Sequence, residues 1–226
     1  MNPLNLASQL TDMFALNQQN SIANDFLAEI RDTQVQQERL RFRTNLKRLG
    51  GLLAYEISKT LPFEEREVIT PLAATRVSTI KSQPVLIPIM RAALPFYEGF
   101  LELFDKADAG FIGAWRTHDS NDQVDAELNY QAAPNLDGKT VIVIDPMLAT
   151  GKSLVKTVAS LLTHGKPAQL HLASVIAAPE GLEYVQKNIQ QPHKVWTCAV
   201  DERLNEKAYI VPGLGDAGDL AFGDKL

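Results

Sequence analysis

One run of residues, from Asp145 to Ser153, combines small, hydroxyl-bearing and charged side chains in a pattern suited to binding an anion. It reads Asp-Pro-Met-Leu-Ala-Thr-Gly-Lys-Ser, and it stands between a β-branched apolar stretch and a helical pattern. The small residues Thr150 and Gly151 let a phosphate approach backbone N–H groups, and a helix start supplies unpaired N–H donors and the positive end of a dipole. The hydroxyls of Thr150 and Ser153 add hydrogen bonds, and Lys152 offers a positive charge. The run therefore predicts a turn that binds a phosphate group.

Two other interpretations of this run compete with a phosphate site. Thr150 or Ser153 would also serve as an ordinary N-cap, because a hydroxyl oxygen there accepts a backbone N–H of the first turn; the local sequence leaves this alternative open. Gly151-Lys152-Ser153 also matches the end of the P-loop of nucleoside triphosphatases. A P-loop requires a glycine five positions before Gly151, but Pro146 stands there and has no N–H to donate. The P-loop interpretation is therefore excluded.

Short apolar strands and helical patterns alternate along most of the chain and must position this run. The uniformly apolar strands indicate an α/β fold with a mostly parallel central sheet and helices on both faces. Ligands bind beyond the carboxyl ends of the strands in such sheets, which is where Asp145 stands. We expect strands at 85–89, 110–114, 140–144, 170–177 and 195–200, and helices at 24–60, 94–104, 151–164 and 180–188.

The chain shows no repeat or linker that would divide it, so we expect one domain over residues 1–226 with a mainly helical segment at 1–60. Gly50-Gly51 interrupts that segment and marks either a break or a close contact between helices. A basic cluster follows the same helical pattern and spreads around it, which favours a solvated or subunit-facing helix surface over a binding stripe. Its members are Arg39, Arg41, Arg43, Lys47 and Arg48.

Composition limits the classes of partner and the compartment. The formal charge is −5 and the pI about 5.4, so nothing overall predicts binding to nucleic acid or to a membrane surface. No apolar run approaches the roughly 20 residues of a membrane span, and Met1–Asn5 lacks the start of a secretory signal. Cys198 is the only cysteine, which suits a reducing compartment. We therefore expect a cytoplasmic protein.

Several separated motifs resemble the uracil phosphoribosyltransferase family, over roughly residues 40–226. Asp145–Gly151 followed by Ser153 resembles the family's motif for phosphoribosyl pyrophosphate (PRPP), and Leu204–Asp219 its uracil-binding segment. The order and spacing of the motifs also agree with the family. The further matches are Pro88-Ile89-Met90-Arg91-Ala92, Phe42-Arg43 through Tyr55-Glu56, Ala177–Gly181 and Phe222-Gly223.

The resemblance implies a type I phosphoribosyltransferase fold with a small hood or arm, the hood at 200–226, and transfer of the phosphoribosyl group from PRPP to uracil. It further implies Mg²⁺ held mainly by PRPP, with no protein metal site, a homodimer or higher homo-oligomer, and GTP as an effector in some relatives. By resemblance, Arg91 and Arg116 face the leaving group, Asp145 the ribose, and Asp216 the junction of the two substrates. The remaining PRPP residues are Pro146, Met147, Leu148, Ala149, Thr150, Gly151, Lys152 and Ser153, and uracil is held by Ile210, Gly215, Asp216 and Ala217.

The reaction gives these residue types a physical purpose. Negative charge develops on pyrophosphate as the C1′ bond breaks, so arginines beside it stabilise the transition state more than the ground state. Backbone N–H and C=O groups in the segment 213–218 suit the acceptor–donor–acceptor edge of uracil and reject cytosine, whose exchanged donor would meet a donor. Asp145 and Asp216 would also fit general acid–base work or a metal site; donor positioning is the interpretation we prefer.

The chain departs from the family at Lys152, Ala93 and Pro95, where the family usually has glycines, and in the region 118–135. Two further functions therefore stay open: a phosphoribosyltransferase for another base, and a catalytically weak paralogue that senses nucleotides. The remaining candidate ligands do not predict a metal site, because their spacing is unsuitable. They are His118, His164, His171, His193 and Cys198, of which Cys198 is expected in the core.

Overall fold

The computed structural model describes the backbone of residues 13–118 and 124–224, together with all of these side chains except those of 114–128. The helices are α2 (Ala23–Arg31), α3 (Arg39–Ser58), α4 (Leu94–Leu103), α5 (Lys152–Leu161), α6 (Pro179–Asn188), α7 (Ala217–Phe222) and the short 3₁₀ helices η2 (Leu16–Gln18) and η3 (Leu162–His164). The strands are β1 (Met13–Ala15), β2 (Phe63–Ile69), β3 (Ala74–Ile80), β4 (Val85–Met90), β5 (Asp108–Ala109), β6 (Phe111–His118), β7 (Val124–Ala132), β8 (Thr140–Ile144), β9 (Met147–Leu148), β10 (Gln169–Ala177), β11 (Lys194–Val200), β12 (Arg203–Leu204) and β13 (Ile210–Val211).

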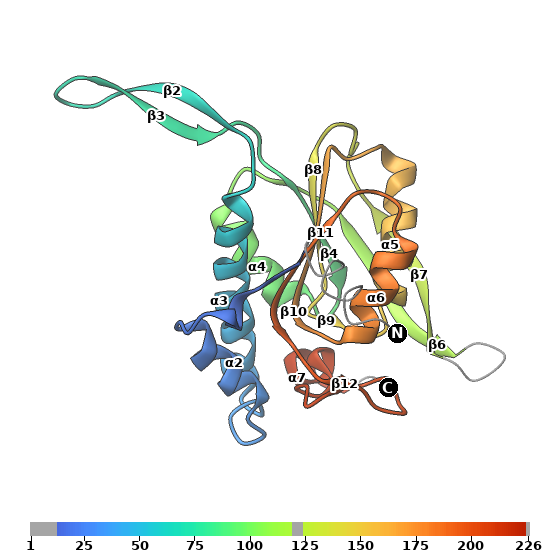
Figure 1. The fold of residues 1–226 in the computed structure, drawn as a ribbon. Helices are drawn as coiled ribbons and strands as arrows, with labels where there is room; N and C mark the ends of the chain where they lie inside the picture. Colours follow the sequence, from blue (N-terminus) through green and yellow to red (C-terminus); the bar gives the residue numbers. More distant parts are fainter. Residues whose placement is uncertain (1–12, 119–123, 225–226) are drawn as a thin grey trace, which may run out of the picture.

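The central sheet has the strand order β1-β11-β10-β8-β4-β6-β7, with β5 beside β4 and β9 beside β10 (Figure 1). Its described pairings are parallel except that of β6 with β7, which is antiparallel. The predicted mostly parallel sheet is thus confirmed. Each of the five expected strands begins within one residue of an observed strand; these strands are β4, β6, β8, β10 and β11. β6 runs to His118, four residues beyond the expected end, because β7 pairs along it.

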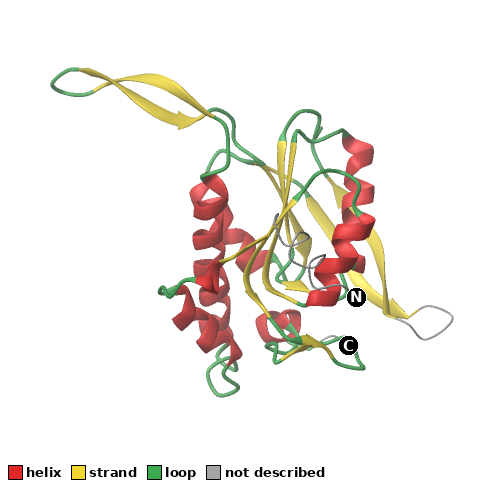
Figure 2. Cartoon of the chain, viewed as in Figure 1, coloured by secondary structure: helices red, strands yellow, loops and turns green. Residues whose placement is uncertain are grey.

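Alternate residues of the strands enter two separate hydrophobic clusters, one on each face of the sheet. Ile142 and Ile144 pack in the cluster that includes α2, α3, α4 and α7. Val141 and Val143 pack in the cluster that includes α5 and α6. Figure 2 shows the helices on both sides of the strands. Burial on both faces explains why β8 is apolar at all five positions.

The expected single helix over 24–60 is wrong, because the chain turns back on itself between α2 and α3. Asp32 ends α2, and its Oδ1 accepts the backbone N–H of Gln34 at 2.8 Å, a local bond that competes with the helix. Glu29 then bonds across the turn to Arg41 and Asn45 of α3. Residues 32–38 contain neither glycine nor proline, so no helix-breaking residue marked the turn in the sequence.

Much of the basic cluster on α3 ties neighbouring elements to that helix. Arg41 pairs with Glu29, and this contact lowers the pKa of the Glu29 carboxyl to about 2. Lys47 pairs with Glu102 at 2.6 Å. Arg43 donates to the carbonyl of Ala221 at 2.7 Å, which joins α3 to α7. The predicted solvated or subunit-facing surface therefore has a further use, since these side chains hold α2, α4 and α7 in place.

The Gly50-Gly51 pair marks a close contact between helices, one of the two alternatives that the sequence offered. A Cβ at Gly50 would lie 2.1 Å from the carbonyl oxygen of Phe96 in α4, and one at Gly99 would lie 2.1 Å from that of Lys47 in α3. The two helix backbones therefore meet without side chains between them. By contrast, a Cβ at Gly51 would find its nearest neighbours at 3.7 Å, an ordinary contact distance.

We expect opposite effects from alanine at these two adjacent glycines. Gly50→Ala forces α3 and α4 apart and lowers the free energy of unfolding by about 2 kcal/mol. Gly51→Ala has room for its methyl group and raises that free energy by about 0.5–1 kcal/mol, because alanine favours the helix. Urea unfolding of both variants checks this. Equal effects in the two variants would contradict the contact.

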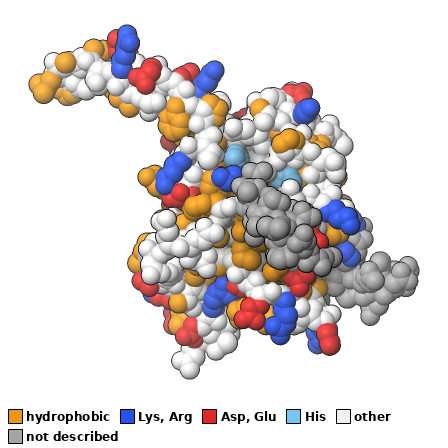
Figure 3. Space-filling view, viewed as in Figure 1, with side chains coloured by type: hydrophobic (Ala, Val, Ile, Leu, Met, Phe, Trp, Pro, Cys, Tyr) orange, Lys and Arg blue, Asp and Glu red, His pale blue; other side chains and the backbone are white. Residues whose placement is uncertain are grey.

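The strands β2 and β3 form a hairpin that projects away from the sheet (Figure 1). Every residue of β2 is exposed, and the hairpin carries exposed apolar side chains along its length (Figure 3). These are Phe63, Val68, Ile69, Leu72 and Val77. The sequence did not predict this hairpin, because β2 reads Phe-Glu-Glu-Arg-Glu-Val-Ile and shows neither a buried run nor a clean alternation.

Three of the residues considered as metal ligands, His171, Cys198 and His164, have roles in packing or in helix ends. His171 is buried on β10, where its Nδ1 accepts the indole N–H of Trp196 at 3.0 Å, and burial lowers its pKa to about 4. Cys198 is fully buried, as expected, and burial raises the pKa of its thiol. His164 ends η3 beside Gly165, also as expected. None of the helices in the described part of the chain has the length and apolar character of a membrane span.

Candidate active site

The register of the sheet brings the loops after β4 and β8 together. Pro88 of β4 is opposite Ile144 of β8, and Ile144 is opposite Ala173 of β10. After β4 the chain crosses to β5 and β6 on one side, whereas β8 and β10 follow on the other side of β4. The order of the strands therefore reverses between β4 and β8. Ligands of open α/β sheets bind at such a point, beyond the carboxyl ends of the strands.

The loop that follows β8 is fastened to β10 by its backbone. The carbonyl of Pro146 accepts the N–H groups of Val175 and Ile176, both at 3.1 Å. The carbonyl of Leu148 accepts the N–H of Ala178 at 2.9 Å. Asp145 accepts the N–H of Met147 at 3.2 Å, so this carboxylate helps to shape the turn. These bonds hold the predicted phosphate turn in one conformation against the sheet.

Gly151 occupies the N-cap position of α5, where no side chain caps the helix. Its φ of +76° is left-handed, and a Cβ there would lie 2.8 Å from the carbonyl oxygen of Gly181, so glycine is required twice over. The Thr150 hydroxyl accepts the N–H of Lys152 at 3.4 Å. An ordinary N-cap at Thr150 or Ser153 is therefore not what the structure has. The rest of the first turn keeps the donors that a phosphate needs.

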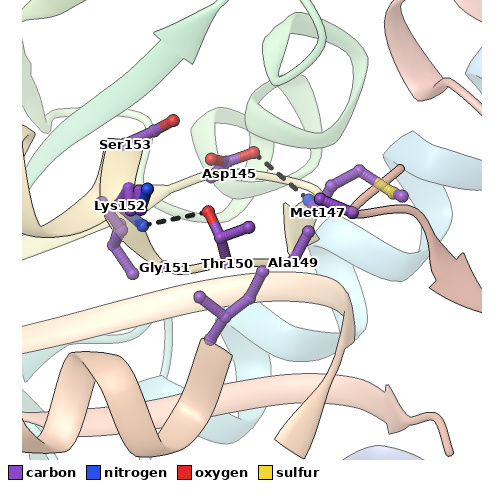
Figure 4. A pocket seen from close by; sticks show the side chains of 10 residues that line it. Asp145, Met147, Ala149, Thr150, Gly151, Lys152 and Ser153 are labelled. Carbon is purple, nitrogen blue, oxygen red and sulfur yellow. Dashed lines mark hydrogen bonds between the residues drawn. The ribbon is translucent and has the colours of Figure 1, made fainter. Parts of the chain in front are cut away.

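A pocket lies over this turn and is shown in Figure 4. Thr150, Lys152 and Ser153 gather at the start of α5, with Asp145 across the loop and Met147 at its far end. The wall of the pocket is completed by Ala208, which belongs to the segment between β12 and β13. The residues that line it are Asp145, Met147, Leu148, Ala149, Thr150, Gly151, Lys152, Ser153, Leu154 and Ala208. Ala208, from the C-terminal part of the chain, thus reaches the predicted phosphate turn.

Arg91, in the loop after β4, points toward the C-terminal segment. Its Nη2 donates to Oδ1 of Asp219 at 3.0 Å and to the carbonyl of Gly223 at 2.7 Å. The side chain is 36 % exposed, yet its Nε is buried and has no hydrogen-bond partner. The structure thereby joins Arg91 to the predicted base segment rather than to the turn after β8.

The predicted base segment includes β13, a glycine turn and the start of α7. Ile210 is buried on β13, and Ala217 is buried at the start of α7. Gly215 lies between them with a left-handed φ of +95°. Asp216 caps α7, and its Oδ1 accepts the N–H groups of Gly218 at 2.8 Å and Asp219 at 3.1 Å. Figure 1 shows α7 and β12 beyond the end of the sheet, where the carboxyl-end loops also lie.

A partly buried ion pair, which the sequence did not predict, clamps this segment to the body of the protein. Arg31 of α2 meets both carboxylate oxygens of Asp201 at 2.7 and 2.8 Å, and it also donates to the carbonyl of Gly213. Asp201 in turn accepts the N–H of Gly213 at 2.9 Å. Asp201 directly follows β11, so its position after a strand was a usable signal. Its partner Arg31 is 170 residues away, and no local pattern connects the two.

Three further sequence expectations concern the neighbours of Arg91 and the second arginine. Ala93 is buried with a right-handed φ of −71°, and Pro95 lies in the first turn of α4, so neither position needs glycine here. Arg116 and His118 lie on β6 opposite Ala126 and Val124. Their side chains are outside the described residues, so the leaving-group role of Arg116 stays a prediction.

Among the side chains that the structure describes, no group of three or more histidine, cysteine, aspartate or glutamate residues is arranged to hold a metal ion. Asp145 and Asp216 each use a carboxylate oxygen for backbone N–H groups.

Comparisons with known proteins agree with this geometry. The chain is 41 % identical over 215 residues to a uracil phosphoribosyltransferase of Porphyromonas gingivalis, covering 95 % of this chain and all of the relative. It is 39 % identical to one of Thermococcus gammatolerans, covering 89 % of each. Among solved structures, the AQ2163 protein of Aquifex aeolicus is similar, with a TM-score of 0.84, 34 % identity, and coverage of 93 % of this chain and 98 % of that one. The family model described as uracil phosphoribosyltransferase matches residues 17–224, and the chain therefore belongs to the uracil phosphoribosyltransferase family.

Proposed function

We propose that this protein transfers the 5-phosphoribosyl group of PRPP to N1 of uracil, giving UMP and diphosphate. The observation that carries the proposal is the convergence of three distant segments: the turn at 145–153, the loop at Arg91, and the hood segment at 200–224. Ala208 of the hood lines the pocket over the turn, and Asp219 of the hood binds Arg91. A phosphate site, a guanidinium and a backbone-built base site thus adjoin each other.

Each segment has a task in this reaction. The uncapped start of α5 binds the 5′-phosphate, and Asp145 lies where it can accept from the ribose hydroxyls. Arg91 stabilises the charge that develops on the diphosphate as the C1′ bond breaks. The backbone groups of Ile210, Gly215 and Ala217 hold the base edge. Mg²⁺, held mainly by the diphosphate oxygens, supplies further neutralisation of that charge when bound.

An assay that follows labelled uracil into UMP, with PRPP and Mg²⁺, tests the proposal. We expect product with uracil and little with cytosine, adenine or hypoxanthine. Faster conversion of a purine would show that the base assignment is wrong. If UMP binds but no product forms under any condition, the protein is a nucleotide sensor rather than an enzyme. Repeating the assay with and without GTP tests the effector that the family resemblance suggests. UMP formation in the cytoplasmic fraction of cells tests the expected cytoplasmic location.

We also propose that the protein is a homodimer or higher homo-oligomer that uses the β2–β3 hairpin. The support is the row of apolar side chains on this projecting hairpin, among them Leu72 at 97 % and Ile69 at 74 % exposure. Exposed apolar side chains concentrated on one projecting element are typical of interaction sites. A second copy of the chain would remove them from water.

The double variant Ile69→Asp/Leu72→Asp is expected to shift the protein to monomers. Charged groups there would have to be desolvated in the interface, and we expect the dimer dissociation constant to rise at least about 100-fold, equivalent to roughly 2.7 kcal/mol. Light scattering coupled to size exclusion measures the change. Leu40→Asp, which replaces an exposed apolar side chain of α3 outside the hairpin, serves as the control. An unchanged mass of the double variant would show that the hairpin is not the interface.

A further inference from the structure

The side chain of Arg91 is held at one end only. Both of its hydrogen bonds use Nη2, which lies between Asp219 and the carbonyl of Gly223. Nε is buried without a partner, and no described residue accepts from Nη1. A guanidinium has five N–H donors in a planar fork that fits phosphate oxygens. Fixing Nη2 therefore orients the plane of the guanidinium and leaves the Nη1 donors for a ligand.

The residue that holds Arg91 also belongs to the base segment. Asp219 lies in the first turn of α7, and its backbone N–H donates to the carboxylate of Asp216 at 3.1 Å. Gly218 lies between these two aspartates. A Cβ there would be 3.1 Å from Oδ1 of Asp216 and 3.8 Å from Nε of Arg91, so glycine keeps side-chain atoms out of the space beside Nε. The arginine and the base segment are thus connected by a continuous set of contacts.

The pair of Arg91 and Asp219 is poorly placed to stabilise the fold. The two side chains are 36 % and 33 % exposed, and ion pairs open to solvent contribute little to stability. The buried Nε of Arg91 is unfavourable unless it finds an acceptor. Both facts agree better with a pair that presents donors to a ligand than with one that holds the protein together.

We propose that Asp219 is a positioning residue for Arg91. Its carboxylate, together with the Gly223 carbonyl, fixes Nη2 so that Nη1 faces the diphosphate group of PRPP, and it thereby ties the diphosphate-binding arginine to the segment that holds the base. This inference rests on the proposed function, because it takes the diphosphate of PRPP as the ligand of Arg91. Asp219 itself touches neither substrate.

Two variants of Asp219 test the proposal by calorimetric titration of Mg²⁺–PRPP in the absence of a base. We expect Asp219→Ala to weaken PRPP binding about tenfold, which corresponds to 1.4 kcal/mol, because the guanidinium loses its orientation. Asp219→Asn keeps an oxygen acceptor for Nη2 and should stay within about threefold of the wild type. In turnover, the KM for PRPP should rise in Asp219→Ala while the KM for uracil changes less than about twofold.

Glu183→Ala is the matched control, since it removes an exposed carboxylate from helix α6, outside the hood and the pocket. It should leave both KM values unchanged. Unaltered PRPP affinity in Asp219→Ala would overturn the proposal, and so would tighter binding, which would mean that the carboxylate competes with the ligand. An equal rise in the two KM values would indicate collapse of the hood instead. If the wild type fails to convert uracil, the proposed function falls, but the PRPP titration still decides the role of Asp219.

Discussion

Arg91→Ala is expected to lower kcat/KM for PRPP by about 100- to 1,000-fold, the range found when one donor to a developing negative charge is removed. The fold should persist, because Arg91 makes only a solvent-accessible ion pair and one bond to a backbone carbonyl. We expect the free energy of unfolding to change by less than about 1 kcal/mol. Steady-state kinetics and urea unfolding on the same preparation separate the two effects.

Two further variants sharpen this experiment. Arg91→Lys keeps the charge but loses the planar fork, and it should recover only part of the activity. Arg203→Ala removes an exposed arginine of the same hood, whose guanidinium pairs with the neighbouring exposed Glu202; it should behave as the wild type. Wild-type kinetics in Arg91→Ala would show that the leaving-group assignment is wrong.

Asp201→Ala should produce the largest combined effect on stability and base binding. The Asp201 side chain is only 5 % exposed and accepts two bonds from Arg31 and one from Gly213. Its removal leaves a largely covered guanidinium and a backbone N–H without their acceptor. We expect a loss of about 3 kcal/mol in the free energy of unfolding, and a KM for uracil at least about tenfold higher, because the turn at 213–217 loses its attachment to α2.

The neighbouring residue supplies the control for this change. Glu202→Ala also removes one carboxylate just after β11, but the Glu202 carboxylate is exposed and, among the described residues, bonds to Arg203 alone; stability and KM should both stay near wild type. Destabilisation without any change in the KM for uracil would show that the clamp serves the fold alone. If neither quantity responds, the ion pair has no importance for the hood.

The strands that carry the site were predictable because they are buried on both faces. Such strands are almost continuously apolar, as in β4 and β8, and this signal is local. β2 and β7 carry charged residues and are stabilised by a single antiparallel neighbour each, so their pattern did not distinguish them from loops. The turn between α2 and α3 was missed because residues 32–38 contain no glycine or proline, and the bond from the Gln34 N–H to the Asp32 carboxylate has no signature in the apolar pattern.

By itself the sequence determined the chemical types at the site and where along the chain they lie. Asp145–Ser153 was assigned to a phosphate after a strand because small residues, hydroxyls and a helix start are local features, and the motifs at Arg91 and 204–219 indicated a sugar diphosphate and uracil by resemblance. Only the tertiary structure decided how these parts meet. The contact of Arg91 with Asp219 spans 128 residues and that of Arg31 with Asp201 spans 170, and such pairings depend on the strand order and register, which no local pattern encodes.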